Sequence, residues 1–396
     1  MFQILGKYFK GDKVIWAVIL ALSLISLLSV YSSTGSLAYR NQEGNTFYYL
    51  LRHGFFLLSG LVIIIITHHI PYKYFSRLSQ FLLILSIPLL LLTLVLGKSL
   101  NQAARWVEVP GLGFTIQSSD FAKLALIMYV ARVLSQKQDK VDDFKGTFLP
   151  VIAPVILVCL LILPANFSTA AIVFFTCLVL LFIGRIKFRY LLLLILSGVL
   201  VFGLFLGAAM LTKHEGRLMT WKNRIENYIN GKSNSNYQVE QAKIAIVNGG
   251  IFGTGPGNNR QRNSLPHSYS DFIYAIIIED YGLIGGIVVI ALYLYLLFRA
   301  GVIVRKAERT FPAFVAIGLT INLVFQAMIN MGVAVNIFPV TGQTLPLVSM
   351  GGTSVLFTCI ALGVILSVSR TLYETEAEIH QVTESTENAE QTQHNN

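Results

Sequence analysis

Asp271 is the residue best placed for chemistry, because a lone carboxylate stands there at the mouth of a long apolar run. A second acidic pair, Glu279 and Asp280, follows about two helical turns further in. Charge in apolar surroundings is costly, so ionisable residues there usually have a function. Helix capping is the simpler explanation, since an acid after Ser270 satisfies free amides and the helix dipole in a first turn.

Three cations accompany this carboxylate and favour an anionic ligand. Arg52 opens the second apolar segment, Arg105 lies in the loop before the fourth, and Lys123 follows Asp120 by three residues. Buried cations need anions nearby, and a lipid with a diphosphate headgroup would supply them at the membrane surface where these residues are expected. The alternatives are snorkelling towards the interface and an internal Asp120–Lys123 pair on one helix face.

The composition identifies an integral membrane protein. Hydrophobic residues make up 54% of the chain and charged residues 13%, with a mean hydropathy of +0.65. A window of about 20 residues, long enough to cross about 30 Å of hydrocarbon, predicts an all-α fold with ten transmembrane helices. These are 14–32, 47–67, 78–97, 121–134, 150–163, 169–184, 190–211, 272–298, 312–331 and 352–368.

Basic residues orient the predicted spans. An even number of spans puts both termini on one side, and Lys and Arg concentrate before the first span and in every second connection, which makes that side cytoplasmic. The predicted membrane domain is 1–370, with a large extracytoplasmic loop at 212–270 between spans seven and eight. Its 242–247 run predicts a short interfacial helix. Residues 371–396 hold six Glu and no Lys or Arg, which predicts a disordered acidic cytoplasmic tail.

Several function classes lose support at this point. The net charge of +10 follows from the cytoplasmic loops, so no nucleic-acid partner is expected. Cys159, Cys177 and Cys359 lie in apolar segments without CxxC spacing, which supports neither a disulfide framework nor a thiolate metal site. The glycine-rich run at 249–257 lacks the Lys-Ser/Thr of a P-loop. A turn-rich loop is favoured there over contact with lipid phosphate.

The motifs of the chain are similar to those of the shape, elongation, division and sporulation (SEDS) family, which includes FtsW and RodA. They are RW at 105–106, QSSDFAKL at 117–124, QAKIA at 241–245, GGIFG at 249–253, LP at 265–266, SDFIYA at 270–275 and GQTLPLVSMGGTS at 342–354. Thr344 resembles the division branch, FtsW, whereas RodA-type elongation members more often have Pro there. Asn166 stands where the family usually has a carboxylate, and Asp120 shortens the usual Glu.

The resemblance implies a peptidoglycan glycosyltransferase that polymerises lipid II at the outer face of the bacterial cytoplasmic membrane. The implied partners are a class B penicillin-binding protein and other division proteins at the septum. Asp271 would act as the base, with Asp120 and Glu279 in support. The substrate-binding residues would be Arg52, Arg105, Lys123, Gln241, Ser270, Thr344, Ser349 and Ser354. A divalent cation such as Mg²⁺ or Mn²⁺ at the diphosphate is left open.

The connection at 332–351 adds a structural expectation. Pro339, Pro346 and several glycines prevent a continuous helix there, yet the segment is too apolar for a free aqueous loop. It is expected to dip into the outer leaflet and line the cavity that holds Asp271; the alternative is a surface loop. Two other functions stay open: a lipid II flippase or transporter with a relay of ionisable groups, and a division scaffold without chemistry.

Overall fold

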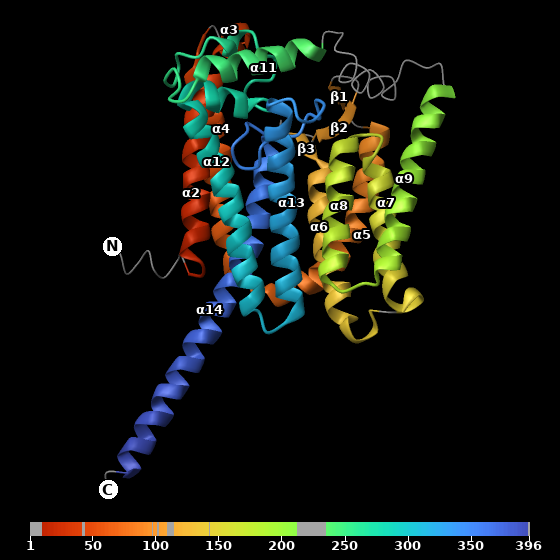
Figure 1. Cartoon of the computed structure of the whole chain (residues 1–396), viewed down its shortest axis with the longest axis vertical. Coiled ribbons are helices and arrows are strands. Elements are labelled where there is room, and N and C mark those ends of the chain that lie inside the picture. The colour runs from red at the N-terminus through yellow and green to blue at the C-terminus, as the bar shows by residue number, and fades with distance from the viewer. Residues whose placement is uncertain are drawn as a thin grey trace.

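The computed structural model describes residues 10–41, 44–96, 98–100, 103–108, 115–141, 143–211 and 235–394, and residues 212–234 of the predicted outer loop lie outside these ranges. Long helices occupy the positions of the ten predicted spans and run side by side (Figure 1). They are α2 (Lys13–Ser33), α4 (Thr46–His69), α5 (Tyr72–Leu96), α6 (Ser118–Gln136), α7 (Leu149–Ile162), α8 (Phe167–Ile183), α9 (Phe188–Leu211), α12 (Ile273–Lys306), α13 (Thr310–Ala334) and α14 (Thr353–His394).

Seven helices in the described part of the chain are long and apolar enough to cross a membrane: α2, α4, α5, α7 with the preceding π-turn η2 (Phe144–Phe148), α12, α13 and α14. Helix α8 is apolar but shorter, and α6 carries Asp120, Lys123 and Arg132. The protein is therefore a mostly helical membrane protein. Helix α13 is the most buried of the seven and packs against α6, α8, α12 and α14, so it forms the centre of the bundle.

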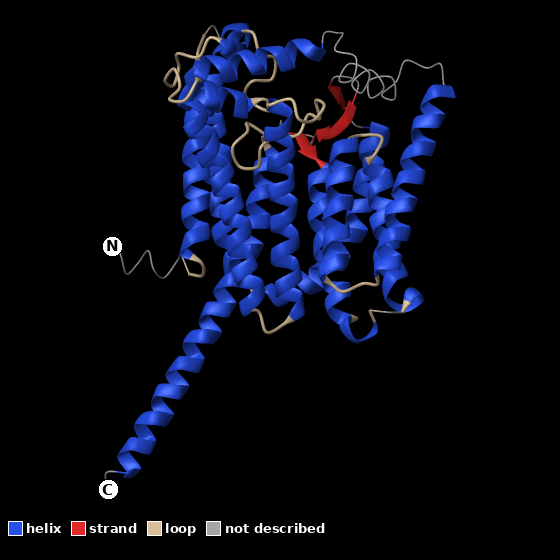
Figure 2. Ribbon diagram, in the orientation of Figure 1, coloured by secondary structure: helices blue, strands red, loops and turns tan. Residues whose placement is uncertain are grey.

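A small β-sheet lies at one end of the bundle, where the sequence predicted only helices and loops (Figure 2). Its strands β1 (Lys98–Leu100), β2 (Ala103–Glu108) and β3 (Thr115–Gln117) pair antiparallel in the order β1-β2-β3. Trp106 faces Gln117 across β2 and β3. Strands this short satisfy their backbone groups by local pairing and leave no signal in a hydropathy window of about 20 residues.

The glycine-rich run closes a break in α12. Gly282 has φ 70° and ψ −173°, outside helical geometry, so nearby peptide groups need other partners. The N–H groups of Leu283 and Ile284 donate to the carbonyls of Gly250 and Ile251, and Thr254 N donates to Glu279 O at 2.8 Å. The run thus joins the end of α11 (Ser235–Gly249) to α12. Close approach to the α12 backbone explains Gly249 and Gly253, where an added Cβ would lie 2.0 Å from Ile278 O and 2.2 Å from Asp280 O.

At the opposite end of α12, one carboxylate connects three helices. Asp12 caps α2 by accepting hydrogen bonds from Val14 N and Ile15 N. Its Oδ2 lies 2.8 Å from Nε of Arg299 on α12, and its backbone N donates to Ser369 Oγ on α14 at 2.8 Å. Asp12 is almost fully buried. The start of the first span is therefore fixed to the ends of two others.

Helix α14 continues to His394, whereas the sequence predicts a disordered tail from residue 371. Figure 1 shows this part extending well beyond the other helices. Because the helix is already nucleated in the packed bundle, each further residue adds a hydrogen bond at little cost. Glu has a good helix propensity and is the most frequent residue in this part of the chain.

Candidate active site

Asp271 immediately precedes α12, whose N-cap is Phe272, and the residue is half-buried. Its main chain is held from two sides. Asp271 O accepts a hydrogen bond from Asn330 Nδ2 of α13 at 2.9 Å, and the neighbouring Ser270 O accepts one from Ser349 Oγ at 2.6 Å. Tyr269 O accepts a third from Met350 N at 3.0 Å. The turn that carries the proposed base is therefore fixed by α13 and by the segment between α13 and α14.

The middle of that segment is buried or half-buried in the protein, so the surface-loop alternative is wrong for residues 341–350, while the position in the outer leaflet stays a prediction. Leu345, Leu347, Val348 and Ser349 are each 2% exposed or less. The buried hydroxyls of two helices hold its main chain: Ser26 Oγ of α2 donates to Val348 O at 2.8 Å, and Tyr293 OH of α12 donates to Pro346 O at 2.5 Å. We call residues 335–352 the inserted segment.

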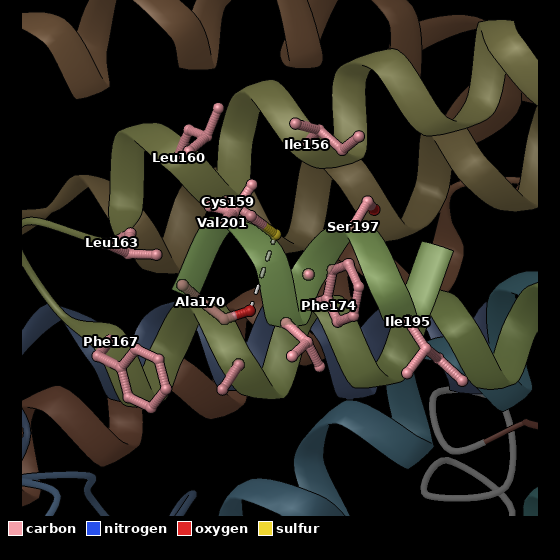
Figure 3. Close-up of a pocket in the computed structure, with 13 residues that line it drawn as sticks. Ile156, Cys159, Leu160, Leu163, Phe167, Ala170, Phe174, Ile195, Ser197 and Val201 are labelled. Atoms are coloured by element: carbon pink, nitrogen blue, oxygen red, sulfur yellow. Dashed lines mark hydrogen bonds between the residues drawn. The ribbon is translucent and has the colours of Figure 1, made fainter. Parts of the chain in front are cut away.

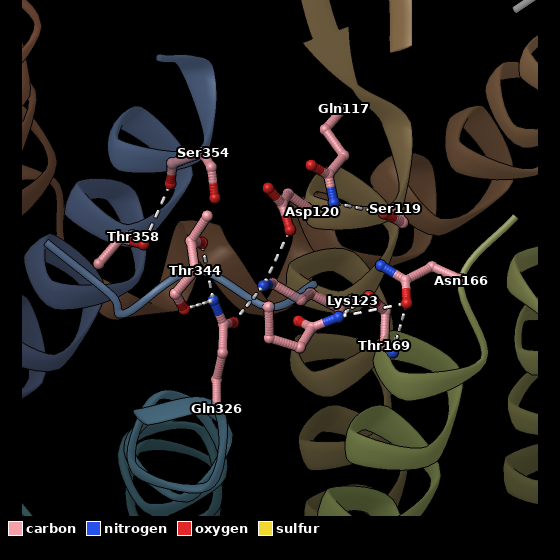
Figure 4. Close-up of polar contacts among 11 residues, drawn as sticks. Gln117, Ser119, Asp120, Lys123, Asn166, Thr169, Gln326, Thr344, Ser354 and Thr358 are labelled. Atoms are coloured by element: carbon pink, nitrogen blue, oxygen red, sulfur yellow. Dashed lines mark hydrogen bonds and ion pairs between the residues drawn. The ribbon is translucent and has the colours of Figure 1, made fainter. Parts of the chain in front are cut away.

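Lys123 is buried on α6 and has two described partners. Its Nζ lies 2.9 Å from Asp120 Oδ1, one helical turn earlier, and donates to Gln326 Oε1 of α13 at 2.8 Å. Gln326 Nε2 in turn donates to Thr344 O at 3.0 Å (Figure 4). The internal Asp120–Lys123 pair is thus formed. Because an ammonium has three donors and Asp120 Oδ2 is buried without a partner, the pair retains capacity for a further ligand.

Asn166 takes part in the same network as an amide. It caps α8, because its Oδ1 accepts from Thr169 N at 3.3 Å. Gln343 of the inserted segment donates through Nε2 to Asn166 Oδ1 at 3.2 Å and to Thr169 Oγ1 at 3.0 Å. A neutral amide therefore fulfils both the capping and the linking role at this position, where the family usually has a carboxylate.

Hydrogen bonds through Gln326, Gln343 and Asn330 bring together several predicted site residues: Asp120, Lys123, Ser270, Asp271, Thr344 and Ser349. The three linking amides were missed in the sequence analysis. Asn322, Gln326 and Asn330 recur at every fourth position of an apolar span. That spacing puts the three on one helix face and could have identified Gln326 and Asn330, but not Gln343, which lies outside α13.

The other predicted site residues lie elsewhere or serve the fold. Arg52 is exposed near the start of α4, and Gln241 is half-buried on α11. Arg105 belongs to β2, and its side chain lies outside the described part of the structure. Buried Glu279 accepts from Arg260 N and Gln261 N, which binds the outer loop to α12.

Besides Thr344, two hydroxyls were predicted to contact the substrate, those of Ser349 and Ser354, and they differ in their hydrogen bonds within the protein. Ser349 Oγ accepts from Leu345 N at 2.8 Å and donates to Ser270 O, so both capacities are used inside the protein. Ser354 is 7% exposed on α14, and its carbonyl accepts from Thr358 Oγ1. In the described residues no group of three or more His, Cys, Asp or Glu side chains could hold a metal ion.

An apolar cavity of about 260 Å³ lies between α7, α8 and α9 (Figure 3). It is lined by Ile156, Cys159, Leu160, Leu163, Phe167, Ala170, Ala171, Phe174, Ile195, Ser197, Gly198, Val199 and Val201. Phe167 is the first residue of α8 and follows Asn166, so the cavity adjoins the polar network described above. A hydrocarbon chain in the cavity would therefore reach a headgroup near that network.

Comparisons with known proteins agree on a family. The model of a family of cell cycle proteins, FtsW, RodA and SpoVE, matches residues 12–374. The chain is 35% identical over 372 residues to a probable peptidoglycan glycosyltransferase FtsW of Coxiella burnetii (strain RSA 493 / Nine Mile phase I), covering 91% of this chain and 96% of that protein. It is 33% identical over 373 residues to stage V sporulation protein E of Bacillus subtilis (strain 168), covering 92% and 98%.

Solved structures show the same fold. One comes from work on the structural coordination of polymerization and crosslinking by a peptidoglycan synthase complex, with a TM-score of 0.71 and 24% identity over 92% of this chain and 98% of that one. Another is the rod shape determining protein RodA of Thermus thermophilus, with a TM-score of 0.66 and 24% identity over 93% and 99%.

Proposed function

The chain belongs to the FtsW, RodA and SpoVE family, and from that premise we propose that it is a peptidoglycan glycosyltransferase that polymerises lipid II, as an FtsW-type enzyme of the division septum. The observation that carries the proposal is the placement of two opposite charges in one network. Asp271 precedes α12, Lys123 lies on α6, and α13 with the inserted segment joins them.

The reaction needs a proton acceptor and a stabilised leaving group. The Asp271 carboxylate removes the proton of the acceptor sugar hydroxyl as its oxygen bonds to C1 of the donor sugar. The bond from C1 to the diphosphate breaks, and undecaprenyl diphosphate leaves with the electron pair. Lys123 offers positive charge to that leaving group as its negative charge grows. The diphosphate linkage itself supplies the driving force.

The apolar cavity between α7, α8 and α9 offers a place for part of the lipid chain of the substrate. Its lining carries almost only carbon atoms, and it adjoins the Asn166 end of the network. A polyprenyl chain held there would present its diphosphate towards Lys123. Arg52, Arg105 and Gln241 remain candidates for outer contacts to the headgroup or sugars, and a divalent cation at the diphosphate would find Asp120 Oδ2 as a ligand.

The topology proposed with this function has ten spans, both termini in the cytoplasm and the 212–270 loop outside. The basic connections favour it. A relay across the bilayer would instead need ionisable groups along the whole path. The proposed partners are a class B penicillin-binding protein and other division proteins.

Polymerisation of lipid II by the purified full chain tests the function. Wild-type protein, alone and with its class B penicillin-binding protein, is expected to give ladders of glycan. Asp271→Asn should lower the rate by about 10²- to 10⁴-fold, the usual contribution of a general base, at an unchanged melting temperature. Asp139→Asn, in the short helix η1 (Gln138–Lys140), is the matched control and should keep the wild-type rate. A wild-type rate in Asp271→Asn removes this residue from the mechanism.

A further inference from the structure

Helix α13 carries three amide side chains on one face inside the bundle. Asn322, Gln326 and Asn330 are spaced by four residues and are 4%, 3% and 1% exposed. A buried amide costs free energy unless its hydrogen bonds are made. Gln326 through both amide atoms and Asn330 through its Nδ2 make hydrogen bonds to site residues, although Asn330 Oδ1, like Asn322 Oδ1, is buried without a partner.

Gln326 acts on the lysine. Its Oε1 accepts from Lys123 Nζ at 2.8 Å, and its Nε2 donates to Thr344 O at 3.0 Å. A lysine side chain is flexible and has many rotamers. With Asp120 on one side and Gln326 on the other, the ammonium is held at one place (Figure 4).

Asn330 acts on the main chain of Asp271, and so on where the carboxylate is placed. Its Nδ2 donates to Asp271 O at 2.9 Å and to Gln343 O at 2.6 Å, which uses both of its protons. Gln343 and Thr344 are consecutive, so the two amides of α13 hold consecutive carbonyls of the inserted segment. The main chain of Asp271 is thereby fixed relative to the same segment that receives Gln326.

We propose that Gln326 and Asn330 are positioning residues for the transfer reaction, Gln326 for the ammonium of Lys123 and Asn330 for the carboxylate of Asp271. This inference rests on the proposed function. Loss of the Gln326 contact frees the ammonium and weakens diphosphate binding, whereas loss of the Asn330 contact shifts the base. The two amides therefore affect different kinetic constants, which a role in stability alone would not produce.

Steady-state kinetics on lipid II and binding of undecaprenyl diphosphate, used as a probe, test this inference on the full chain. Gln326→Met should raise KM and the probe's Kd by about tenfold, the value of one hydrogen bond to a charged group. Gln326→Glu keeps an acceptor for Lys123 and should recover most of that loss. Asn330→Leu should lower kcat by about 10²-fold, as expected for a base displaced by about 1 Å, with unchanged KM and probe stoichiometry.

Asn322→Leu is the matched control, because Asn322 is a buried amide on the same face of α13 and lacks the hydrogen bonds to the Asp271 turn and the inserted segment that Asn330 makes in the described part of the structure. It should leave KM, kcat and Kd unchanged. Wild-type values in both Gln326→Met and Asn330→Leu overturn the inference, and so does an equal loss in all three apolar variants that follows their melting temperatures. A wild-type protein that makes no glycan overturns the proposed function instead.

Discussion

Replacing Lys123 with Met tests whether the lysine only compensates the charge of Asp120 or also binds the diphosphate of the substrate. At 2.9 Å and an effective dielectric constant of about 20, the attraction between the two charges is about 6 kcal/mol. Desolvation offsets part of it, but the substitution leaves Asp120, which is 2% exposed, as an uncompensated buried charge. Breaking such a pair on one side costs about 3 to 5 kcal/mol of folding stability.

The double variant Asp120→Asn/Lys123→Met removes both charges and should regain most of that stability. It should not regain substrate binding, because no cation remains to face the diphosphate. The assays are thermal unfolding in detergent and the Kd for undecaprenyl diphosphate, measured on both variants and on Asp120→Asn. If the double variant recovers wild-type affinity together with stability, the lysine serves only Asp120 and the proposed role of Lys123 is wrong.

Three further outcomes follow from the packing. Thr344→Cys should react slowly with an impermeant thiol reagent and more slowly with lipid II present, while Ser349→Cys should not react; free labelling of both would contradict the buried position of the inserted segment. Gly282→Ala should destabilise the protein by more than about 2 kcal/mol, since the added Cβ would lie 2.0 Å from the carbonyl oxygen of Ile251. Gly301→Ala on the same helix is the control, because an added Cβ there has open space, and equal thermal stabilities of the two variants would refute the prediction. Asp12→Asn should lower the melting temperature without changing the KM for lipid II, and a raised KM would show that this end of the bundle acts on the site.

The positions of the long helices were accessible from the sequence because hydropathy is a local property. Runs such as 14–32 and 312–331 need only about 20 consecutive residues to reveal a span, and both are helices in the structure. The three-stranded β-sheet was missed because strands of three to six residues give no such signal. The tail beyond residue 370 was predicted to be disordered from its composition, but it extends a helix that the bundle has already nucleated.

In the candidate site, the sequence identified the charged residues but not the neutral residues that form hydrogen bonds with them. Asp271, Lys123 and Asp120 stand out because charges are rare in apolar segments. Gln326 and Asn330 are neutral, and the sequence of the span that contains them does not indicate which distant segment they contact. Gln343 was quoted only as part of a motif, although it joins α8 to the inserted segment.

The sequence by itself determined that this chain lies in a membrane, roughly where its long apolar helices lie, and which charges are too costly to be accidental, because each depends on neighbours along the chain. The tertiary structure decided which neutral side chains hold these charged residues in place. Lys123 and Gln326 are 203 residues apart, and Asp271 and Asn330 are 59 apart. Such contacts form only when packing brings helices together and buried amides must find partners. Their pairing is therefore a property of the assembled bundle.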